Sequence, residues 1–449
     1  MLYEISEKAK KEISKYCDNY EIYLEKEEIL QLDAQKNNLE FAKEEINIGI
    51  GIRVIVDNKI GFAYSSDVGK IEDVSKKAFL NSKLNESDEN FSFAEKSNLT
   101  EVKNICDPKF DKLSIEEVSD FLEYIIHTSE EAGSEPTSGG FSAAHEKFLL
   151  VNSNEVSSFN ESTGFSAFIA LNAEKDGEKS TAYDSVSSCF FDLDGEKLAK
   201  NTCQVAKDSI GGFKVETRDM NVVLGYHAAV GLFNTFINAF NADNVQRGRS
   251  ILGDKVGESI INENLSIYDD GTIEGGLNSS SCDNEGTGSQ RTDLVKNGVL
   301  KGFIYDMYTS KKANNQNMNN NEDGNDNEDI KSTANGFRAS YSGTPSVSPS
   351  NIIVDFNEKI DISEIDHGFL ATDVLGAHTA NPISGDFSVE ANNAFIIENG
   401  EISKPVKKAM ISGNIFKALS DCKGVNSEIK QYGPFILPKI ICNNLRIVG

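Results

Sequence analysis

The chain has 449 residues, of which 39% are hydrophobic and 26% charged, as in ordinary soluble globular proteins. Its formal net charge of −27 repels nucleic-acid phosphates and anionic lipid, so we expect neither nucleic acid nor a membrane as a partner. No apolar run approaches the roughly 20 residues that a membrane-spanning helix needs. The length predicts two domains, or three, each able to build a core.

The cysteines indicate the compartment. There are seven, an odd number, and no two have the Cys-x-x-Cys spacing of a redox or zinc motif. They are Cys17, Cys106, Cys189, Cys203, Cys282, Cys422 and Cys442. The N-terminal stretch "MLYEISEKAKKEISKYC" predicts a charged amphipathic helix and lacks the apolar core of a signal peptide. We therefore expect a cytoplasmic protein.

Residues 1–214 are predicted to form an N-terminal α+β domain, that is, a mixed sheet with flanking helices. Long strand patterns occur in "YEIYLEKEEILQLDAQ" and "INIGIGIRVIVDNKIGFAYS", and strand–turn–strand patterns occur between 138 and 185. Helical patterns occur at 4–16, 68–83, 114–133 and 194–209. In the third of these helices, Ser114 is the expected N-cap and Gly133 the expected stop. A sheet covered by these helices would bury their apolar stripes.

The pattern changes near residue 215, and residues 215–449 are predicted to form a β-rich, barrel-like C-terminal domain. Apart from a helix around His227–Ala239 and a short one at 413–421, this half consists of strand and turn patterns. Asn297-Gly298 and Asn399-Gly400 lie between strand patterns, an arrangement typical of two-residue hairpin turns.

One segment of the C-terminal half is almost free of apolar residues. It is residues 311–333, "KKANNQNMNNNEDGNDNEDIKST". Such a segment cannot bury enough surface to offset the entropy that it loses on ordering. We therefore predict a mobile Asn/Asp-rich loop, which acts either as a lid or as a solvated insertion.

His145 and Glu146 begin a word similar to the HExxH motif of zinc peptidases. The second histidine is missing, since positions 149 and 150 are both leucine. The flanking residues follow a strand pattern, whereas the motif needs a helix to bring its ligands to one face. A metal site of this kind is therefore not expected here.

His227 lies on the apolar helix predicted from "LGYHAAVGLF". One interpretation is a hydrogen-bonded histidine of the core. The other is a dispersed metal site built from His227, His367, His378 and a cysteine such as Cys442, since ligands can converge from distant parts of a chain. Both interpretations stay open at this point.

Four stretches of the sequence carry a family pattern. They are "GIGIRVIVDNKIGFAYSSDV" near the N-terminus, the region from Asp243 to Tyr308 with "DDGTIEGGLNSSSCDNEGTGSQRTDLV", then "STANGFRAS", and later "NPISGDFSVEANNAFIIENG". In order and spacing they resemble the TldD/PmbA family, specifically its TldE (PmbA) branch, over nearly the whole chain.

In that family the TldD branch resembles a zinc metallopeptidase, in which an HExxxH word supplies two histidine ligands and a glutamate base, and a later cysteine completes the site. When this sequence is aligned with the HExxxH word, His227 matches the first ligand, Ala228 the glutamate and Leu232 the second ligand. The turn "SEIKQYGPFILPKI" lacks the cysteine, and Cys442 lies beyond it. Activation of water needs the ligands, an open position and a base. The resemblance therefore implies no catalytic residue, no metal ligand and no cofactor in this chain.

The resemblance implies a pseudoenzyme that pairs with a TldD-like metallopeptidase subunit, which holds the zinc, and a dimer that hydrolyses small, unfolded or extended peptides. A β-rich domain can hold an extended peptide by main-chain hydrogen bonds, although the sequence does not identify the residues that bind it. Two alternatives stay open: a stand-alone homodimeric peptide-binding protein, and a metallopeptidase with a rebuilt metal site. The family's older label, a modulator of DNA gyrase, gains no support from so acidic a chain.

Overall fold

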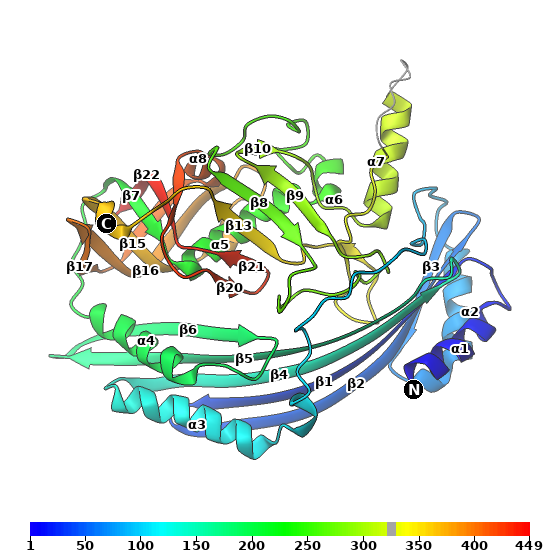
Figure 1. The fold of residues 1–449 in the computed structure, drawn as a ribbon, viewed down its shortest axis with the longest axis horizontal. Helices are drawn as coiled ribbons and strands as arrows, with labels where there is room; N and C mark the ends of the chain where they lie inside the picture. The colour runs from blue at the N-terminus through cyan, green and yellow to red at the C-terminus, as the bar shows by residue number, and fades with distance from the viewer. Residues whose placement is uncertain (321–328) are drawn as a thin grey trace.

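The computed structural model describes residues 1–320 and 329–449, and its N-terminal half is built on one long curved sheet (Figure 1). The sheet has six strands in the order β3-β2-β1-β4-β5-β6. They are β1 (Tyr20–Gln35), β2 (Asn38–Val56), β3 (Lys59–Ser65), β4 (Glu135–Asn152), β5 (Ser157–Lys175) and β6 (Glu178–Ser188). The α+β class is confirmed.

Every pairing in this sheet is antiparallel, whereas a mixed sheet was expected. Local turns explain the pairings between strands that are consecutive in the chain, which are all those in the sheet except β1 with β4. β2 and β3 are joined by Asp57 and Asn58, both with positive φ (53° and 58°), and β5 and β6 by Asp176 and Gly177 (53° and 81°). Two successive residues of positive φ form the tight hairpin turn that matches strand twist, and a hairpin can only pair its strands antiparallel.

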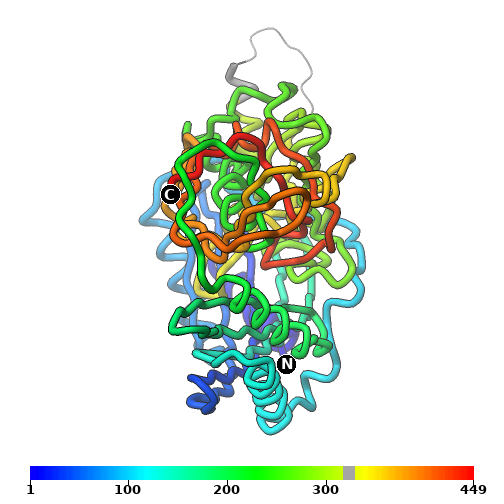
Figure 2. Tube along the Cα trace, turned by 90° about the vertical axis from the view of Figure 1, so that its left-hand side faces the viewer, coloured from blue at the N-terminus to red at the C-terminus, as the bar shows by residue number. Residues whose placement is uncertain are grey.

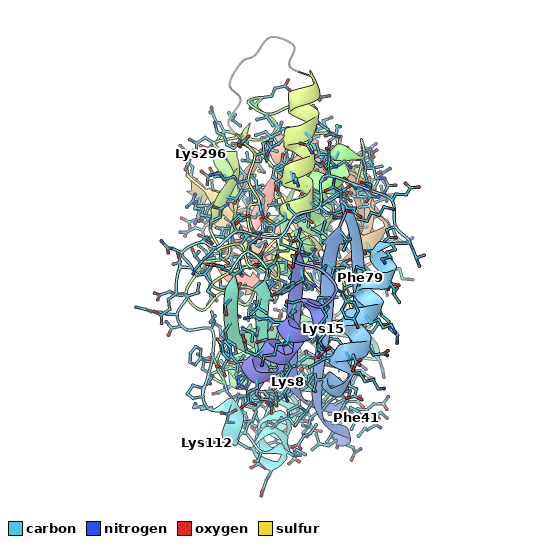
Figure 3. All side chains as sticks on the ribbon, turned by 90° about the vertical axis from the view of Figure 1, so that its right-hand side faces the viewer. Lys8, Lys15, Phe41, Phe79, Lys112 and Lys296 are labelled. Carbon is cyan, nitrogen blue, oxygen red and sulfur yellow. The ribbon has the colours of Figure 1, made fainter. Side chains whose placement is uncertain are left out.

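The helices cover one face of the sheet as two pairs at opposite ends of the strands (Figure 1). One pair is α1 (Leu2–Ile13) and α2 (Ile71–Ser82), and Figure 3 looks onto this end. The other pair is α3 (Ile115–Glu131) and α4 (Gly195–Asp208). Each pair buries its own apolar cluster against the sheet. The predicted cap of α3 is confirmed, since the Ser114 hydroxyl accepts a hydrogen bond from the Glu117 N–H.

The C-terminal half contains the predicted barrel. Its strands are β7 (Arg218–Leu224), β15 (His367–Leu375), β16 (Asp386–Glu398), β18 (Ala409–Asn414) and β22 (Ile440–Val448). The barrel closes because β22 pairs with both β18 and β7. α5 (Tyr226–Ile237) contributes its apolar residues to one core shared by the barrel and a second sheet.

The second sheet has six strands in the order β10-β9-β8-β13-β21-β20. They are β8 (Leu265–Asp270), β9 (Arg291–Lys296), β10 (Val299–Leu300), β13 (Ile352–Phe356), β20 (Lys430–Tyr432) and β21 (Phe435–Leu437). The smaller elements are α6 (Ala242–Gln246), α8 (Ile415–Ser420), β11 (Gly336–Phe337), β12 (Ser346–Val347), β14 (Lys359–Ile360), β17 (Glu401–Val406) and β19 (Cys422–Val425), with 3-10 turns η1 (Val68–Lys70), η2 (Phe110–Lys112), η3 (Asn238–Phe240), η4 (Ile362–Glu364) and η5 (Ala377–Thr379). Both predicted Asn-Gly hairpins are confirmed, with positive φ at Asn297 and at Asn399.

The segment predicted as a loop at 311–333 begins instead as a helix. α7 (Met307–Asn320) projects from the body of the protein (Figures 1 and 3). Its first turn is fixed by reciprocal hydrogen bonds between Asp306 and Thr309, and the Asn314 side chain bonds to both backbone groups of Ile330. These polar contacts supply the order that apolar burial cannot. Of the remainder of the predicted loop, residues 321–328 lie outside the described residues, and residues 329–333 are in neither a helix nor a strand.

The concave face of the N-terminal sheet packs against the C-terminal half through a buried ionic network, and Figure 2 shows the two layers from the side. Arg53 of β2 donates two hydrogen bonds of 2.8 Å to Glu21 of β1. Arg338 also pairs with Glu21, and Arg53 reaches Glu285 at 3.2 Å. Burial raises the pKa of Glu21, but Arg338 and Arg53 outweigh burial, so its pKa is lowered overall.

Glu25 lies four residues after Glu21 on β1 and provides a pH test of this contact. It accepts a 2.6 Å hydrogen bond from the Tyr341 N–H, and burial raises its pKa to about 7 against the opposing effect of that bond. Because the folded pKa exceeds the unfolded value of about 4, the folded state binds the extra proton, and stability falls as the pH rises through this range. Glu25→Gln is expected to match the wild type near pH 4, where the carboxyl is largely protonated in both states, and to be more stable, by on the order of 2 kcal/mol, at pH 8. Urea unfolding at both pH values measures this; an equal difference at both would contradict it.

Candidate functional site

The position of the family histidine is set by the junction of β7 and α5. β7 ends at Leu224, Gly225 makes the turn, and His227 is the second residue of the helix. A Cβ atom at Gly225 would lie 2.6 Å from the Thr372 carbonyl oxygen, so only glycine lets the helix start this close to β15. His227 is thereby held at the rim of the barrel core, facing the N-terminal sheet.

The imidazole of His227 is engaged by a carboxylate from the other domain. Its Nε2 lies 2.8 Å from Oδ1 of Asp184 on β6. The same oxygen accepts hydrogen bonds from the Tyr432 hydroxyl at 3.1 Å and from the Ser185 N–H at 2.8 Å. Burial raises the pKa of Asp184, but the hydrogen bond and charge of His227 outweigh it, so the pKa is lowered overall. The site is a hydrogen-bonded link between the N-terminal and C-terminal halves.

The two positions that complete the family's helix motif lie in the apolar core. Ala228 is 0% exposed and Leu232 is 1% exposed, and both belong to the cluster that fills the barrel. Alanine can neither bind a metal nor move a proton, and leucine supplies no donor atom. The residues at this position therefore do not fit a catalytic zinc ion, which needs several nitrogen, sulfur or oxygen ligands.

The dispersed metal site is not assembled either. His367 opens β15 and His378 lies in η5, both exposed, whereas Cys442 is buried in β22 opposite Val222 of β7. Within residues 1–320 and 329–449, one set of three or more potential ligands has its donor atoms within 4.8 Å of one another. That set contains none of these four residues.

The set consists of Cys106, His145 and Glu161, and it includes the histidine of the HExxH-like word. The expectation of a strand there is confirmed, since His145 lies in β4. Successive strand residues face opposite sides of a sheet, so Glu146 cannot share a ligand set with His145. The HExxH pattern does not identify this cluster, because its partners lie on one helix, whereas Glu161 lies on the neighbouring strand β5 and Cys106 in the connection between α2 and α3.

Asp184 was also missed by sequence reasoning. It lies in "AYDSVSS", which carries no recognisable motif, and it is 43 positions from His227. Only the packing of the N-terminal half against the C-terminal half brings the pair together. A polar residue that alternates with apolar ones on a strand is normally solvent-exposed, so no local signal distinguishes it.

Several cavities lie between the N-terminal and C-terminal halves, and two of them are relevant to function. One, of about 290 Å³, is bounded by β4 and β5 on one side and by loops of the C-terminal half on the other. Its lining includes the amide and hydroxyl side chains of Asn160, Ser162, Asn278, Ser280, Asn284 and Ser350. The other, of about 240 Å³, lies beside the His227 link and is lined by β6, the start of α4 and residues 428–432, including Asp184 and Tyr432.

Replacing Asp184 with Asn tests the link between the domains. Loss of a charged acceptor for three donors is expected to lower the free energy of unfolding at pH 7 by about 1–3 kcal/mol. The folded pKa lies below the unfolded value, so the carboxylate's contribution is present above about pH 4 and is lost as the pH falls through the folded pKa. Thermal unfolding from pH 3 to 7 should show the difference shrinking toward low pH. A constant difference would assign the effect to packing.

Among the described residues no helix has both the length and the apolar content needed to cross a bilayer. All seven cysteines carry free thiols. Neither fact identifies a chemistry for the chain.

Known protein families and structures supply the remaining information. The sequence matches the profiles of PmbA/TldA metallopeptidase domain 1 over residues 20–82, the central domain over 108–210 and the C-terminal domain over 217–449. An uncharacterized protein of Methanocaldococcus jannaschii is 35% identical over 413 residues, which cover 92% of each chain. A metalloprotease TldD homolog of Buchnera aphidicola subsp. Acyrthosiphon pisum is 25% identical over 410 residues, 85% of this chain and 80% of that one.

The fold has a close match among solved structures. The crystal structure of TldE from Thermococcus kodakarensis superposes with a TM-score of 0.88 and 24% sequence identity, covering 99% of this chain and 100% of that one. Both the sheet of the N-terminal half and the barrel of the C-terminal half thus fall within one known architecture. The chain belongs to the PmbA/TldA metallopeptidase family.

Proposed function

We propose that this chain is the noncatalytic, TldE/PmbA-like subunit of a two-chain cytoplasmic metallopeptidase, and that a TldD-like partner supplies the zinc ion and the general base. The substrates are small, unfolded or extended peptides. This chain contributes binding surface and stabilises the active partner, and it takes no part in activating water.

One observation carries the proposal: the three positions at which the family's motif has catalytic residues have no room here for a metal ion or a base. The single histidine is hydrogen-bonded to Asp184 across the domain boundary, and the positions of the base and of the second ligand are apolar and buried. Restoring chemistry there would require a carboxylate and an imidazole inside a packed core, where both would lose hydration. Pairing with a subunit that keeps the motif needs no such change.

The cavity bounded by β4, β5 and the loops of the C-terminal half supports the binding of peptides. Its amide and hydroxyl groups can donate to and accept from a peptide backbone, whatever the side chains of the peptide. Its volume of about 290 Å³ suits a short length of chain rather than a folded domain. Selectivity for unfolded or extended peptides follows from these two features.

The test is reconstitution. The chain and the HExxxH-bearing protein that co-purifies with it from the native source are expressed separately and together, followed by size-exclusion chromatography and assay with an unstructured peptide. We expect no hydrolysis by the chain alone, hydrolysis by the mixture, and one copy of each chain in the active species. His227→Ala in this chain is expected to change the activity of the mixture by less than about twofold, since His227 takes no part in chemistry.

Two results support the alternatives. Co-purification of the chain only with itself, together with binding of the peptide but no hydrolysis, supports a stand-alone peptide-binding homodimer. Hydrolysis by the isolated chain that disappears in His227→Ala supports a rebuilt metal site. Either result overturns the proposed role as a noncatalytic subunit.

A further inference from the structure

A polar patch interrupts the helix-covered face of the N-terminal sheet. Along β4, Ala143 packs under α3 and α4, and Leu149 packs under α1 and α2. His145 and Lys147 lie between them on the same face, because strand side chains alternate. Glu161 of β5 extends the patch on the neighbouring strand, opposite Lys147. The patch therefore occupies the gap between the two helix pairs (Figure 1).

The connection between α2 and α3 covers this gap. The Thr163 N–H of β5 donates to the Ile105 carbonyl at 2.9 Å, and the Asp107 N–H donates to the Thr163 hydroxyl at 2.7 Å. These bonds hold Cys106 over β5. The ring of Phe110 meets His145 edge-on, with 5.1 Å between ring centroids. The segment from Ile105 to Phe110 is thus held against the sheet at both of its ends.

Three donor atoms converge under this cover. The Cys106 thiol, a ring nitrogen of His145 and a carboxylate oxygen of Glu161 all lie within 4.8 Å of one another. Nε2 of His145 is 2.8 Å from Oε1 of Glu161. The spacing lies within reach of a tetrahedral metal site after small rotations of the side chains.

The second ring nitrogen of His145 is an independent indication of a metal site. The residue is 3% exposed, and its Nδ1 has no hydrogen-bond partner. The nearest charged atom is Oδ1 of Asp111, at 3.6 Å. A histidine that binds a metal through one nitrogen usually directs the N–H of the other to a carboxylate, and Asp111 is placed for that role.

We propose that Cys106, His145 and Glu161 form a zinc-binding site, with Nε2 of His145 as the nitrogen ligand and Asp111 as the acceptor for its Nδ1–H. Thiolate, imidazole and carboxylate together suit Zn²⁺ and related divalent ions rather than Mg²⁺ or Ca²⁺. The charges of the thiolate and the carboxylate balance that of the ion. On binding, the thiol releases its proton to solvent and no electron is transferred.

The site is structural. It lies on the opposite face of the sheet from Phe148, which lines the cavity of about 290 Å³, so it stands apart from the proposed peptide-binding surface. A bound ion would tie the connection between α2 and α3 to two strands at once. It is also separate from His227, so the presence or absence of metal at Cys106 does not bear on the proposed function, whereas metal at His227 would.

Lys147 is the competitor for Glu161. Its Nζ is 2.8 Å from the same Oε1, and its side chain is partly exposed. A bound ion would displace Lys147 toward solvent, so Lys147→Met is expected to tighten binding. A protonated imidazole would instead bridge Glu161 and Asp111 without any metal. The first arrangement binds added Zn²⁺, whereas the second does not.

The experiment titrates the chelator-treated full chain with Co²⁺ and then with Zn²⁺. We expect one Co²⁺ per chain with thiolate charge-transfer absorption, which Zn²⁺ abolishes by displacement. Cys106→Ser should remove the absorption, and His145→Gln and Glu161→Gln should each weaken binding at least about tenfold. Cys17→Ser and His227→Ala serve as controls and should bind as the wild type does.

A measurement on the unmodified chain guards against variants that fold poorly. Zn²⁺ should slow alkylation of Cys106, followed by mass spectrometry, and leave the alkylation of Cys17 unchanged. Equal alkylation of Cys106 with and without Zn²⁺ overturns the proposal. So does a cobalt spectrum that survives Cys106→Ser. Loss of metal in His227→Ala with retention in Cys106→Ser would instead place the ion at His227 and overturn the proposed function.

Discussion

Replacement of Arg53 with Met is expected to lower the free energy of unfolding by about 3–5 kcal/mol, because it leaves a buried carboxylate with half of its partners. Arg53 makes two hydrogen bonds to Glu21, and both side chains are almost fully buried. Methionine fills a similar volume, so the loss is mainly electrostatic. The measurement is urea unfolding at pH 7, with the change in m-value used to detect partial separation of the domains.

A matched substitution on the surface separates burial from loss of a charge. Arg446 pairs with Asp219 at 3.1 Å, but both side chains are more than half exposed. Arg446→Met is expected to cost less than about 1 kcal/mol. The double variant Arg53→Met/Glu21→Gln should be less unstable than the sum of the single changes, since neither Arg53 nor Glu21 is then left without the other, although Arg338 still loses its carboxylate. Equal effects of Arg53→Met and Arg446→Met would contradict the importance of the buried network.

Introduction of the family's glutamate by Ala228→Glu is expected to destabilise the chain by at least about 3 kcal/mol and to create no peptidase activity. Ala228 is fully buried among the apolar residues of the barrel core. A longer side chain has no space there, and its charge would lose hydration without gaining a partner. Thermal unfolding measures the loss, and the assay with an unstructured peptide checks activity.

The control for this prediction lies on the same helix. Asn234 is an exposed residue of α5, so Asn234→Glu adds the same charge without burying it. Its effect is expected to stay within about 0.5 kcal/mol. Normal stability of Ala228→Glu would mean that the core opens at this point, and the site would then be able to accept a base.

The two proposed sites lie on opposite faces of the N-terminal sheet. The concave face and the C-terminal half form the cavity proposed to bind peptides and the ionic network that joins the two halves. The helix-covered face holds the Cys106 cluster, which concerns the stability of a connection. Metal bound to the isolated chain would therefore not by itself indicate a peptidase, and the variants at 106 and 227 decide where the ion lies.

The amino-acid sequence by itself determined the local elements. Positive-φ turns at Asn297-Gly298 and Asn399-Gly400, the cap at Ser114 and the strand containing His145 were all predictable, because each depends on neighbouring residues. The family assignment was also accessible, since it rests on the order of motifs. The absence of the glutamate and of the second histidine beside His227 can be read directly.

Only the tertiary structure decided what the polar side chains contact. The sequence offers no reason for Asp184 to meet His227, for Arg53 to meet Glu21, or for Cys106 and Glu161 to meet His145, because these partners come from separate elements. The helix α7 was likewise missed, since side-chain hydrogen bonds to distant residues rather than apolar periodicity hold its described part. Local propensity is encoded within a few residues, whereas hydrogen bonds and ion pairs across domains depend on how the whole chain packs.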